Sequence, residues 1–407
     1  MTEKLYQSDP TMLEFDAAIV EATTREGRCE IVLDRTCFYP GGGGQPCDLG
    51  ILGGARVLEV GYRGEQIVHV VEPAPGADGC AALAPGPVHG AVDGPRRRDF
   101  MQQHTGQHIF SQALMRAGKL ETVSVHFGDE DTTVEVRADA VDEMLIRKAE
   151  DIANSAIKEN RRVILHEVDR AEASRFPLRR TPPDEGRLRI VEVESFDWAA
   201  CGGVHVASSG EVFLVKATFQ EKIRGRVRIH VMIGNRALED YGRKIALAQG
   251  LSRTLTCGES FILGRVQELV EKEKGSTREL RRLRLAQASA DADDSTSAAR
   301  GIGGALCVRR VFNEAGDEYL KAFVERVVAT PGRVAIAVDR GPEKFQWIVA
   351  HSLGNGLELS EFLPGLMEIA DAKGGGRGAR MQGIGNTNEA IALFADAIEA
   401  ELARRLG

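Results

Sequence analysis

The sequence predicts a multidomain protein of the α+β class. Its 407 residues allow two to three domains of about 100–200 residues each. Short apolar or alternating segments, separated by Gly, Asp and Pro, fill residues 1–90, and helical periodicity first appears at residues 100–117. Strands and helices then alternate toward the C-terminus. This pattern is typical of sheets covered by helices rather than of an all-helical or all-strand fold.

The composition is that of an ordinary globular chain, and it excludes several function classes. Hydrophobic residues make up 43% and charged residues 28%, and 52 Lys and Arg against 60 Asp and Glu give a net charge of −8. A uniformly basic nucleic-acid binder is excluded, whereas a local basic face is not. No apolar run approaches the roughly 18–20 residues of a membrane span, and no secretory signal opens the chain. Seven scattered cysteines argue against a disulfide framework and for a reducing cytoplasm.

Two strand-rich domains are expected first. Residues 1–90 are predicted to form a small β-barrel that carries a glycine-rich motif; a sandwich is the alternative. Residues 91–234 are predicted to form an α/β domain, with helices at 100–117 and 141–159 interleaved with strands.

Helices dominate the segment that follows. Residues 235–287 are predicted to form an antiparallel helical hairpin, and a coiled-coil dimer arm is the alternative. Residues 288–300 have few side chains to bury and are predicted to be a linker. Residues 301–407 are predicted to form a C-terminal α/β module with a glycine-rich loop at 373–385 and a last helix at 388–406.

Two pairs of potential metal ligands stand out. His104 and His108 are four residues apart on a predicted helix, so their side chains lie on one face. Cys201 and His205 flank a double glycine that would let the backbone bend tightly. Together they give the His₃Cys donor set that tetrahedral zinc accepts. The alternative is that these are two ordinary buried histidines and a buried cysteine beside a hydrogen-bonded histidine.

Four protein ligands would close the coordination shell, which is typical of a structural ion, whereas catalysis requires an open position. If one ligand yields to substrate, His205 is the one we would expect. A zinc protease of the HExxH type is disfavoured, because Thr105 stands where its glutamate would be.

These residues and their neighbours resemble a known family. Residues 34–50 (DRTCFYPGGGGQPCDLG) are similar to the glycine motif of alanyl-tRNA editing domains, residues 98–108 to its first zinc motif, residues 201–206 to its second, and residues 221–228 to the basic strand pair that follows. Their order and separations agree over about residues 1–235. The chain therefore resembles the long form of the freestanding AlaX family. One departure is Val204, which stands where the family usually has Thr.

The resemblance implies a cytoplasmic hydrolase with one Zn²⁺ per chain that removes serine, and in some cases glycine, wrongly esterified to tRNA(Ala). It implies that Thr36 contacts the serine hydroxyl; an ordinary strand threonine is the alternative. The glycine run 41–44 offers backbone N–H groups without an obstructing Cβ to an oxyanion or phosphodiester, chiefly at Gly43 and Gly44, and a flexible hairpin turn is the alternative. Gln45 would donate to the ester carbonyl or the ribose. Editing of Ser-tRNA(Thr) and a non-catalytic tRNA-binding module with structural zinc are the alternatives.

Contacts to tRNA are expected from basic residues and from the C-terminal module. Residues 373–385 are similar to the glycine loop of the DHH-associated domain, which implies contact with the outer corner of the tRNA, although Gly378, Ala379 and Arg380 stand where Pro-Asp is common. A solvated charged face is the alternative for each arginine group. A homodimer through the hairpin or the C-terminal domain is also expected. The expected tRNA contacts are Arg96, Arg98, Arg179, Arg180, Arg224, Arg226, Gly375, Gly376 and Arg377.

Overall fold

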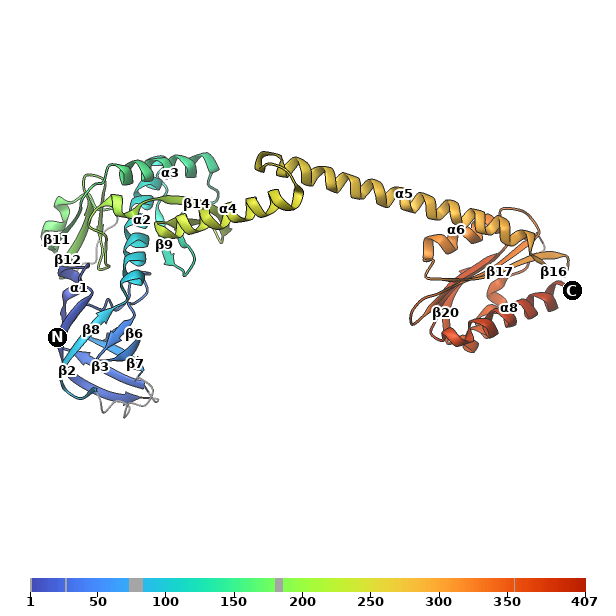
Figure 1. Ribbon diagram of the computed structural model, residues 1–407, viewed down its shortest axis with the longest axis horizontal. Helices are drawn as coiled ribbons and strands as arrows, with labels where there is room; N and C mark the ends of the chain where they lie inside the picture. The colour runs from blue at the N-terminus through green and yellow to red at the C-terminus, as the bar shows by residue number, and fades with distance from the viewer. Residues whose placement is uncertain (1, 26–27, 73–82, 180–185, 355) are drawn as a thin grey trace. The chain divides into compact units, whose positions relative to one another are not determined.

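The computed structural model of this protein describes residues 2–25, 28–72, 83–179, 186–354 and 356–407 (Figure 1). The chain forms two compact units, Met1–Leu251 and Ser252–Gly407, called unit 1 and unit 2 below. Each combines sheets with helices, so the α+β class and the multidomain organisation agree with the sequence. Among the described helices, none has the length and apolarity that a membrane span requires.

Unit 1 begins with an antiparallel sheet that closes on itself. Six strands pair in the order β2-β3-β7-β6-β5-β8, and β8 pairs back with β2. Alternate residues of β3, namely Cys29, Ile31 and Leu33, are buried inside, as the two-residue period of a strand requires. The strands are β2 (Glu14–Arg25), β3 (Arg28–Leu33), β5 (Gly50–Leu52), β6 (Ala55–Arg63), β7 (Gln66–Glu72) and β8 (Gly86–Val92).

A short N-terminal segment packs beside this barrel. The two-residue strand β1 (Glu3–Lys4) pairs in parallel with β4 (Arg35–Thr36), and helix α1 (Leu5–Ser8) follows it. Tyr6 of α1 is fully buried, so the aromatic ring anchors the segment.

The rest of unit 1 is a helix and sheet layer that shares one apolar core with the barrel. A four-stranded sheet runs in the order β14-β15-β10-β9, and a three-stranded sheet in the order β11-β12-β13. The elements are β9 (Thr122–Phe127), β10 (Thr132–Val136), α3 (Glu143–Lys158), β11 (Val163–Asp169), η2 (Arg170–Arg175), β12 (Arg187–Val193), β13 (Asp197–Ala200), η3 (Ser209–Val212), β14 (Val215–Ile223) and β15 (Arg226–Ile233).

Helix α2 (Gly94–Gly118) lies at the centre of unit 1 and packs against β9, β10 and β15 (Figure 1). Asp93 caps its N-terminus by accepting from the backbone N–H of Arg96, and Pro95 in the first turn has no N–H and therefore needs no acceptor. Lys119 ends it in the left-handed conformation. Every residue from Phe100 to Phe110 is buried, although many are polar.

Unit 2 is a six-stranded sheet with helices on both faces. The strand order is β16-β17-β18-β19-β21-β20, and the parallel pair β17 and β18 is joined through α6. Its elements are η4 (Glu259–Phe261), α5 (Ile262–Ser297), β16 (Arg300–Ile302), β17 (Ala305–Asn313), α6 (Asp317–Val328), β18 (Arg333–Arg340), β19 (Phe345–His351), η5 (Leu359–Glu361), α7 (Leu363–Leu366), η6 (Met367–Ala370), β20 (Ala372–Arg377), β21 (Arg380–Gly385), η7 (Asn388–Ala390) and α8 (Ile391–Leu406). Helix α4 (Asn235–Leu255) precedes them and spans the boundary at Leu251.

The predicted linker at residues 288–300 is wrong, because α5 continues to Ser297. Ala288 and Ala292, one turn apart, are fully buried in a cluster with residues of α6. Small side chains that have little to bury in isolation allow two helices to approach closely. The hydroxyl of Tyr319 on α6 donates to Asp291, and Arg326 pairs with Asp293 at 2.8 Å. Residues 235–287 do contain two helices, α4 and most of α5.

Two smaller expectations also change. The glycine-rich segment at 373–385 is a β-hairpin, β20 and β21, rather than a loop. A Cβ on Gly376 would lie 2.1 Å from the carbonyl oxygen of Arg380, so the close approach of the strands needs glycine there. Cys29 is disulfide-bonded, which the sequence did not predict, because scattered cysteines argue against a disulfide framework but do not exclude one bridge. Cys80 lies outside the described residues.

Candidate metal centre

The two predicted ligand pairs lie together in unit 1. His104 and His108 project from α2, and Cys201 and His205 follow the end of β13. Their ligand atoms all lie within 4.8 Å of one another. The Cys201 Sγ is 3.2 Å from His104 Nε2 and 3.4 Å from His205 Nε2. Donors of a tetrahedral zinc site are about 3.3–3.6 Å apart, given the usual Zn–N and Zn–S bond lengths. The cluster can therefore hold a metal ion, and its donors are those zinc accepts.

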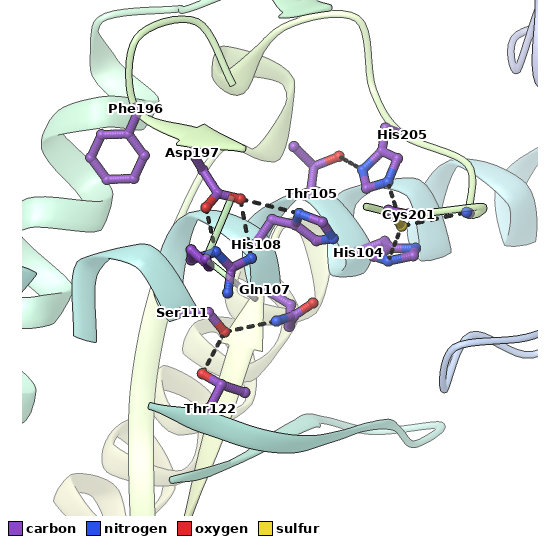
Figure 2. Close-up of polar contacts among 12 residues, drawn as sticks. His104, Thr105, Gln107, His108, Ser111, Thr122, Phe196, Asp197, Cys201 and His205 are labelled. Atoms are coloured by element: carbon purple, nitrogen blue, oxygen red, sulfur yellow. Dashed lines mark hydrogen bonds and ion pairs between the residues drawn. The ribbon is translucent and has the colours of Figure 1, made fainter. Parts of the chain in front are cut away.

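Each histidine in the cluster has a partner at Nδ1, so that Nε2 is the nitrogen available to an ion (Figure 2). Nδ1 of His104 is 2.7 Å from Gln45 Oε1, and Nδ1 of His108 is 3.2 Å from Asp197 Oδ2. Gln45 and Asp197 accept through these oxygens, so each Nδ1 carries the proton. Metal-binding histidines in proteins usually donate from the distal nitrogen in this way.

The third histidine shows how the chain replaces an expected hydroxyl. Nδ1 of His205 lies 3.1 Å from Oγ1 of Thr105, which also accepts from the backbone N–H of Val206. Thr105 directly follows His104 on α2, and its hydroxyl orients His205, a role that Val204 cannot take because it has no hydroxyl. Val204 itself is fully buried and apolar. Each of the three imidazoles thus has a hydrogen-bond partner at Nδ1.

The electrostatics of the cluster favour a Cys201 thiolate and a neutral His205. Burial opposes ionisation of the Cys201 thiol, but the neighbouring His104 and His205 outweigh it and bring its pKa well below the ordinary value. Burial and the neighbouring His104 lower the pKa of His205 to about 3. Burial also opposes charging of His108, but Asp197 raises its pKa to about 9, so an ion binding there must displace a proton.

The loop that carries Cys201 is held by one arginine and by one glycine. Nη1 of Arg189 donates to the carbonyl oxygens of Cys201 at 3.0 Å and of Gly203 at 2.7 Å. A Cβ on Gly203 would lie 2.2 Å from Cε1 of His104, so only glycine leaves room for that imidazole. Neither glycine of the pair has positive φ. The need for glycine is therefore clearance at Gly203, and the predicted tight bend is not the reason.

A cavity of about 570 Å³ opens beside the cluster. On one side it is lined by the glycine turn and two barrel tyrosines, on the other by α2 and β9. The lining residues are Gln7, Tyr39, Gly41, Gly42, Gly43, Tyr62, His104, Gln107, His108, Thr122, Val123, Ser124, Val125, Arg179, Ala199, Ala200, Cys201, Gly202 and Gly203. Part of the metal cluster therefore forms a wall of a space large enough for a small substrate.

Comparison with known proteins identifies the family. The alanyl-tRNA editing protein AlaX-M of Methanosarcina acetivorans is 35% identical over 228 residues, which cover 53% of this chain and 92% of that protein. The chain belongs to the AlaX family of alanyl-tRNA editing proteins. The mouse alanyl-tRNA editing protein Aarsd1 is 27% identical and covers 99% of this chain and 96% of its own length.

Longer proteins are also similar to this AlaX family member. The alanine–tRNA ligase of Ignicoccus hospitalis is 27% identical over 98% of this chain, and the chain spans 43% of the length of that ligase. No protein-family model matches the sequence.

The structure separates the four residues expected to contact the substrate ester. Gly43 lines the cavity, whereas Gly44 is not part of the lining, and a Cβ on Gly44 would be 2.8 Å from the carbonyl oxygen of Val125. Gln45 is buried and orients His104, so it does not face the ester. Its Nε2 is buried, and no described residue accepts from it.

Thr36 is placed differently from the expectation that it contacts the serine hydroxyl. It is fully buried and is not part of the cavity lining. Nδ1 of His69 donates to the carbonyl oxygen of Ile31, so Nε2 of His69 accepts from the hydroxyl of Thr36 at 2.9 Å. The same hydroxyl accepts from the backbone N–H of Phe38. Since its proton is committed, Thr36 holds the barrel together and cannot donate to substrate from this position.

The arginines expected to contact tRNA fall into three groups. Arg179 lines the cavity and pairs with Asp197, so it supports His108. Arg96, Arg98 and Arg226 make protein contacts, to the Cys47 carbonyl, Glu211 and Glu135 respectively. Arg224, Gly375, Gly376 and Arg377 are exposed, and Arg180 lies outside the described residues.

Several residues of the site escaped the sequence pattern. Asp197 and Arg189 support the ligands across long sequence separations, and no spacing rule indicates them. Thr105 could have been identified from the sequence, because it lies inside the first motif. Gln107 and Tyr62 line the cavity, one beside a ligand on α2 and the other on the barrel strand β6.

Proposed function

We propose that this protein hydrolyses the ester of mischarged Ser-tRNA(Ala), acting in trans on tRNA that has left its synthetase. The proposal rests on one observation above all: a His₃Cys cluster lies in the wall of a cavity in a member of an editing family. Relatives named as alanyl-tRNA editing proteins support the choice of tRNA(Ala).

Zinc would be held by His104, His108, Cys201 and His205, and when bound it supplies a polarising charge that activates water or the ester carbonyl. The chain's own groups keep that site in shape. Gln45, Thr105 and Asp197 fix the three rings, and Arg189 fixes the backbone of the cysteine loop. Such second partners typically change metal affinity or activity by about 10–100-fold.

The glycine turn would bind the oxygen atoms of the substrate. Gly42 and Gln45 exchange two backbone hydrogen bonds that close the turn, so the N–H of Gly42 is used. Among the described residues, no acceptor is bonded to the N–H of Gly43, and a Cβ on Gly43 would meet nothing. Its φ of +59° also favours glycine. The N–H of Gly43 is therefore the best placed donor to an ester oxygen or the terminal phosphodiester.

Selection of serine would depend on a cavity group other than Thr36. Nε2 of Gln107 donates to Oγ of Ser111 at 2.7 Å, and Thr122 donates to the same oxygen at 2.9 Å. This arrangement fixes the amide of Gln107 so that Oε1 is left for the cavity (Figure 2). Oε1 can accept from the hydroxyl or the ammonium group of a seryl ester. A site that hydrogen-bonds a substrate hydroxyl rejects an analogue without it by about 10⁴–10⁵-fold.

Deacylation of four substrates side by side tests the proposal. Ser-tRNA(Ala) should be hydrolysed, and Ala-tRNA(Ala) and Ser-tRNA(Thr) should be spared. Gly-tRNA(Ala) should be a weaker substrate, because excluding a methyl group is worth only about 1–3 kcal/mol. Comparable hydrolysis of all four substrates would contradict the proposed specificity. If no substrate were hydrolysed, the proposal that the protein is an enzyme would be contradicted.

Thr36→Val checks the reassignment of Thr36. The variant should lose about 1–3 kcal/mol of stability, because buried partners lose their hydrogen bonds. Its preference for Ser-tRNA(Ala) over Ala-tRNA(Ala) should stay within about 3-fold of the wild type, while Gln107→Leu should lower it. A large loss of preference in Thr36→Val would restore the original assignment.

A non-catalytic tRNA-binding module is the second candidate, since four protein ligands are typical of a structural zinc. The adjoining cavity favours catalysis instead. Editing of Ser-tRNA(Thr) is tested by including that substrate in the deacylation assay above. The exposed arginines and the β20–β21 hairpin remain proposed tRNA contacts, and homodimer formation remains a prediction.

A further inference from the structure

One rim of the cavity is not used by the chemistry proposed above. Gln7 and Tyr62 line the cavity there, and Lys4 and Tyr6 contact Tyr62; these four residues are called the tyrosine rim below. Tyr62 lies near the end of β6 and is 52% exposed, although it lines the cavity together with Gln7. A large aromatic ring left half exposed beside a catalytic cavity is available to bind part of a substrate.

The Tyr62 ring is held by buried neighbours. Its hydroxyl lies 3.2 Å from the hydroxyl of Tyr6, which is fully buried. The Tyr6 ring packs edge-on against Tyr39, with centroids 5.5 Å apart. The hydroxyl of Tyr39 in turn donates to the carbonyl oxygen of Gly42 at 3.0 Å. A line of three tyrosines thus joins the exposed ring to the glycine turn that would bind the ester, so the two surfaces keep a fixed separation.

A positive charge accompanies the ring. Nζ of Lys4 lies 5.2 Å from the centroid of Tyr62, close enough for a cation–π contact. Lys4 is positioned by β1, whose pairing with β4 ties it to the barrel. An aromatic face next to a cation is how proteins bind single-stranded nucleotides, with the base on the ring and the phosphate near the charge.

The geometry points to the tyrosine rim as the subsite for the 3′-terminal base of the tRNA, with the base stacked on Tyr62 and Lys4 beside a terminal phosphate. This inference rests on the proposed function, because the ester to be cleaved is borne by the terminal ribose and its base must lie within a few ångströms of the metal cluster. Stacking has little dependence on base identity. The rim therefore recognises an unpaired end, and selection of the amino acid stays with the other walls.

Binding is tested with the full-length protein and an uncharged acceptor-stem minihelix whose 3′-terminal base is 2-aminopurine. Its fluorescence should be quenched on binding to the wild type and to Tyr62→Phe, which keeps the ring. Tyr62→Leu should lose the quenching and bind about 10–100-fold more weakly. Phe219→Leu, which removes an aromatic ring 62% exposed on β14 and outside the cavity, is the matched control and should bind like the wild type.

A double-mutant cycle makes the test specific. A minihelix that ends in an abasic nucleotide should bind the wild type as weakly as Tyr62→Leu binds the complete one, and the two losses should not add. Additive losses, or a Tyr62→Leu variant that matches Phe219→Leu, would overturn the inference. Circular dichroism and metal content of each variant exclude a folding defect.

Hydrolysis separates this inference from the proposed function. Tyr62→Leu should raise KM for Ser-tRNA(Ala) with little change in kcat, since the ring positions the end and does not touch the ester. If the wild type hydrolyses Ser-tRNA(Ala) and Tyr62→Leu has the same KM, the base-binding role of the tyrosine rim is contradicted and the proposed hydrolase function stands. If quenching depends on Tyr62 but the wild type hydrolyses no substrate, the proposed hydrolase function is contradicted and the base-binding role of the tyrosine rim stands.

Discussion

Helices α2 and α5 contrast in what they bury. Helix α2 is buried along most of its length, and the buried side chains include Gln102, Gln103, His104, Gln107 and His108. Helix α5 has leucines and valines along its length, yet its only buried residues are Ala288 and Ala292. Mean hydropathy does not distinguish the two helices, because both are polar on average, yet only α2 is buried.

The difference follows from where polar partners are available. Buried polar groups are tolerated when each finds a hydrogen-bond partner, and α2 has them on several sides. Gln103 bonds the carbonyl of Ile233 and accepts from Thr132, while Gln102 bonds the carbonyl of Glu211. In α5 the small residues pack and the large ones do not. A polar helix at the centre of a unit therefore signals a functional site, whereas an apolar stripe on a long helix does not by itself signal a core.

Loss of the candidate ligand Cys201, which lies beside α2, should have the largest effect. Cys201→Ala should lower hydrolysis of Ser-tRNA(Ala) by about 10³-fold or more, because several kcal/mol of charge stabilisation are lost. Zinc content should fall in parallel, measured by elemental analysis of the purified protein. The control is Cys47→Ala, which removes a partly buried free cysteine outside the cluster and should keep both the hydrolysis rate and the zinc content of the wild type. A Cys201→Ala variant that is folded and fully active would make the ion structural.

Burial should also decide what an ion pair contributes. Arg97 of α2 and Asp48 are 1% and 2% exposed, with Nε of Arg97 3.1 Å from the carboxylate, whereas Arg281 of α5 and Glu318 are 64% and 59% exposed. Asp48→Asn should destabilise unit 1 by about 3–5 kcal/mol, because it leaves a buried charge unpaired. Glu318→Gln should change the stability of unit 2 by less than about 1 kcal/mol.

The two tryptophans allow each unit to be followed separately. Trp198 lies in unit 1 and Trp347 in unit 2, and these are the only two in the chain. Denaturant unfolding by fluorescence in a Trp347→Phe background reports unit 1, and in a Trp198→Phe background it reports unit 2. Equal losses for Asp48→Asn and Glu318→Gln would contradict the dependence on burial.

A buried histidine should make unit 1 sensitive to acid. Burial lowers the pKa of His69 to about 4, well below its ordinary value near 6.5. The unfolded chain therefore binds a proton that the folded barrel refuses, and stability is lost as pH falls from about 6.5 to 4, by about 3 kcal/mol in all. Unfolding of unit 1 measured across this range should be less pH-dependent in His69→Gln. Identical pH profiles for the two proteins would show that other groups account for the acid sensitivity.

The sequence is sufficient to identify the four candidate metal ligands but not the residues that hydrogen-bond and orient them. His104 and His108 are linked by helical spacing, and the cysteine pair by its short motif, so local patterns suffice for all four. Asp197, Arg189 and Gln45 lie 89, 12 and 59 residues from the groups they hold, and only the folded chain brings them together. The role expected of Thr36 was wrong for the same reason: the sequence does not show whether a threonine near a motif faces the cavity or the barrel interior.

Long-range packing also explains the errors in the fold. Residues 288–297 contain Ala, Ser and Asp, a composition shared by linkers and by tight helix contacts, and only the presence of α6 decides between them. The order of elements, by contrast, follows from periodicity and from Gly, Asp and Pro. Local signals therefore predicted most elements, and non-local contacts decided their environments.

The smallest predicted effect concerns a leucine of helix α5. In this helix an exposed leucine should matter less to stability than a buried alanine. Leu283 is 54% exposed, so Leu283→Ala should change the stability of unit 2 by less than about 0.5 kcal/mol. Ala288→Leu should cost about 1–3 kcal/mol, because a fully buried alanine next to α6 leaves no room for a larger side chain. Unfolding followed by Trp347 fluorescence measures both. A costly Leu283→Ala whose effect grows with protein concentration would mean that a second copy covers the leucine stripe, and would turn the exposed face of α5 into an interface.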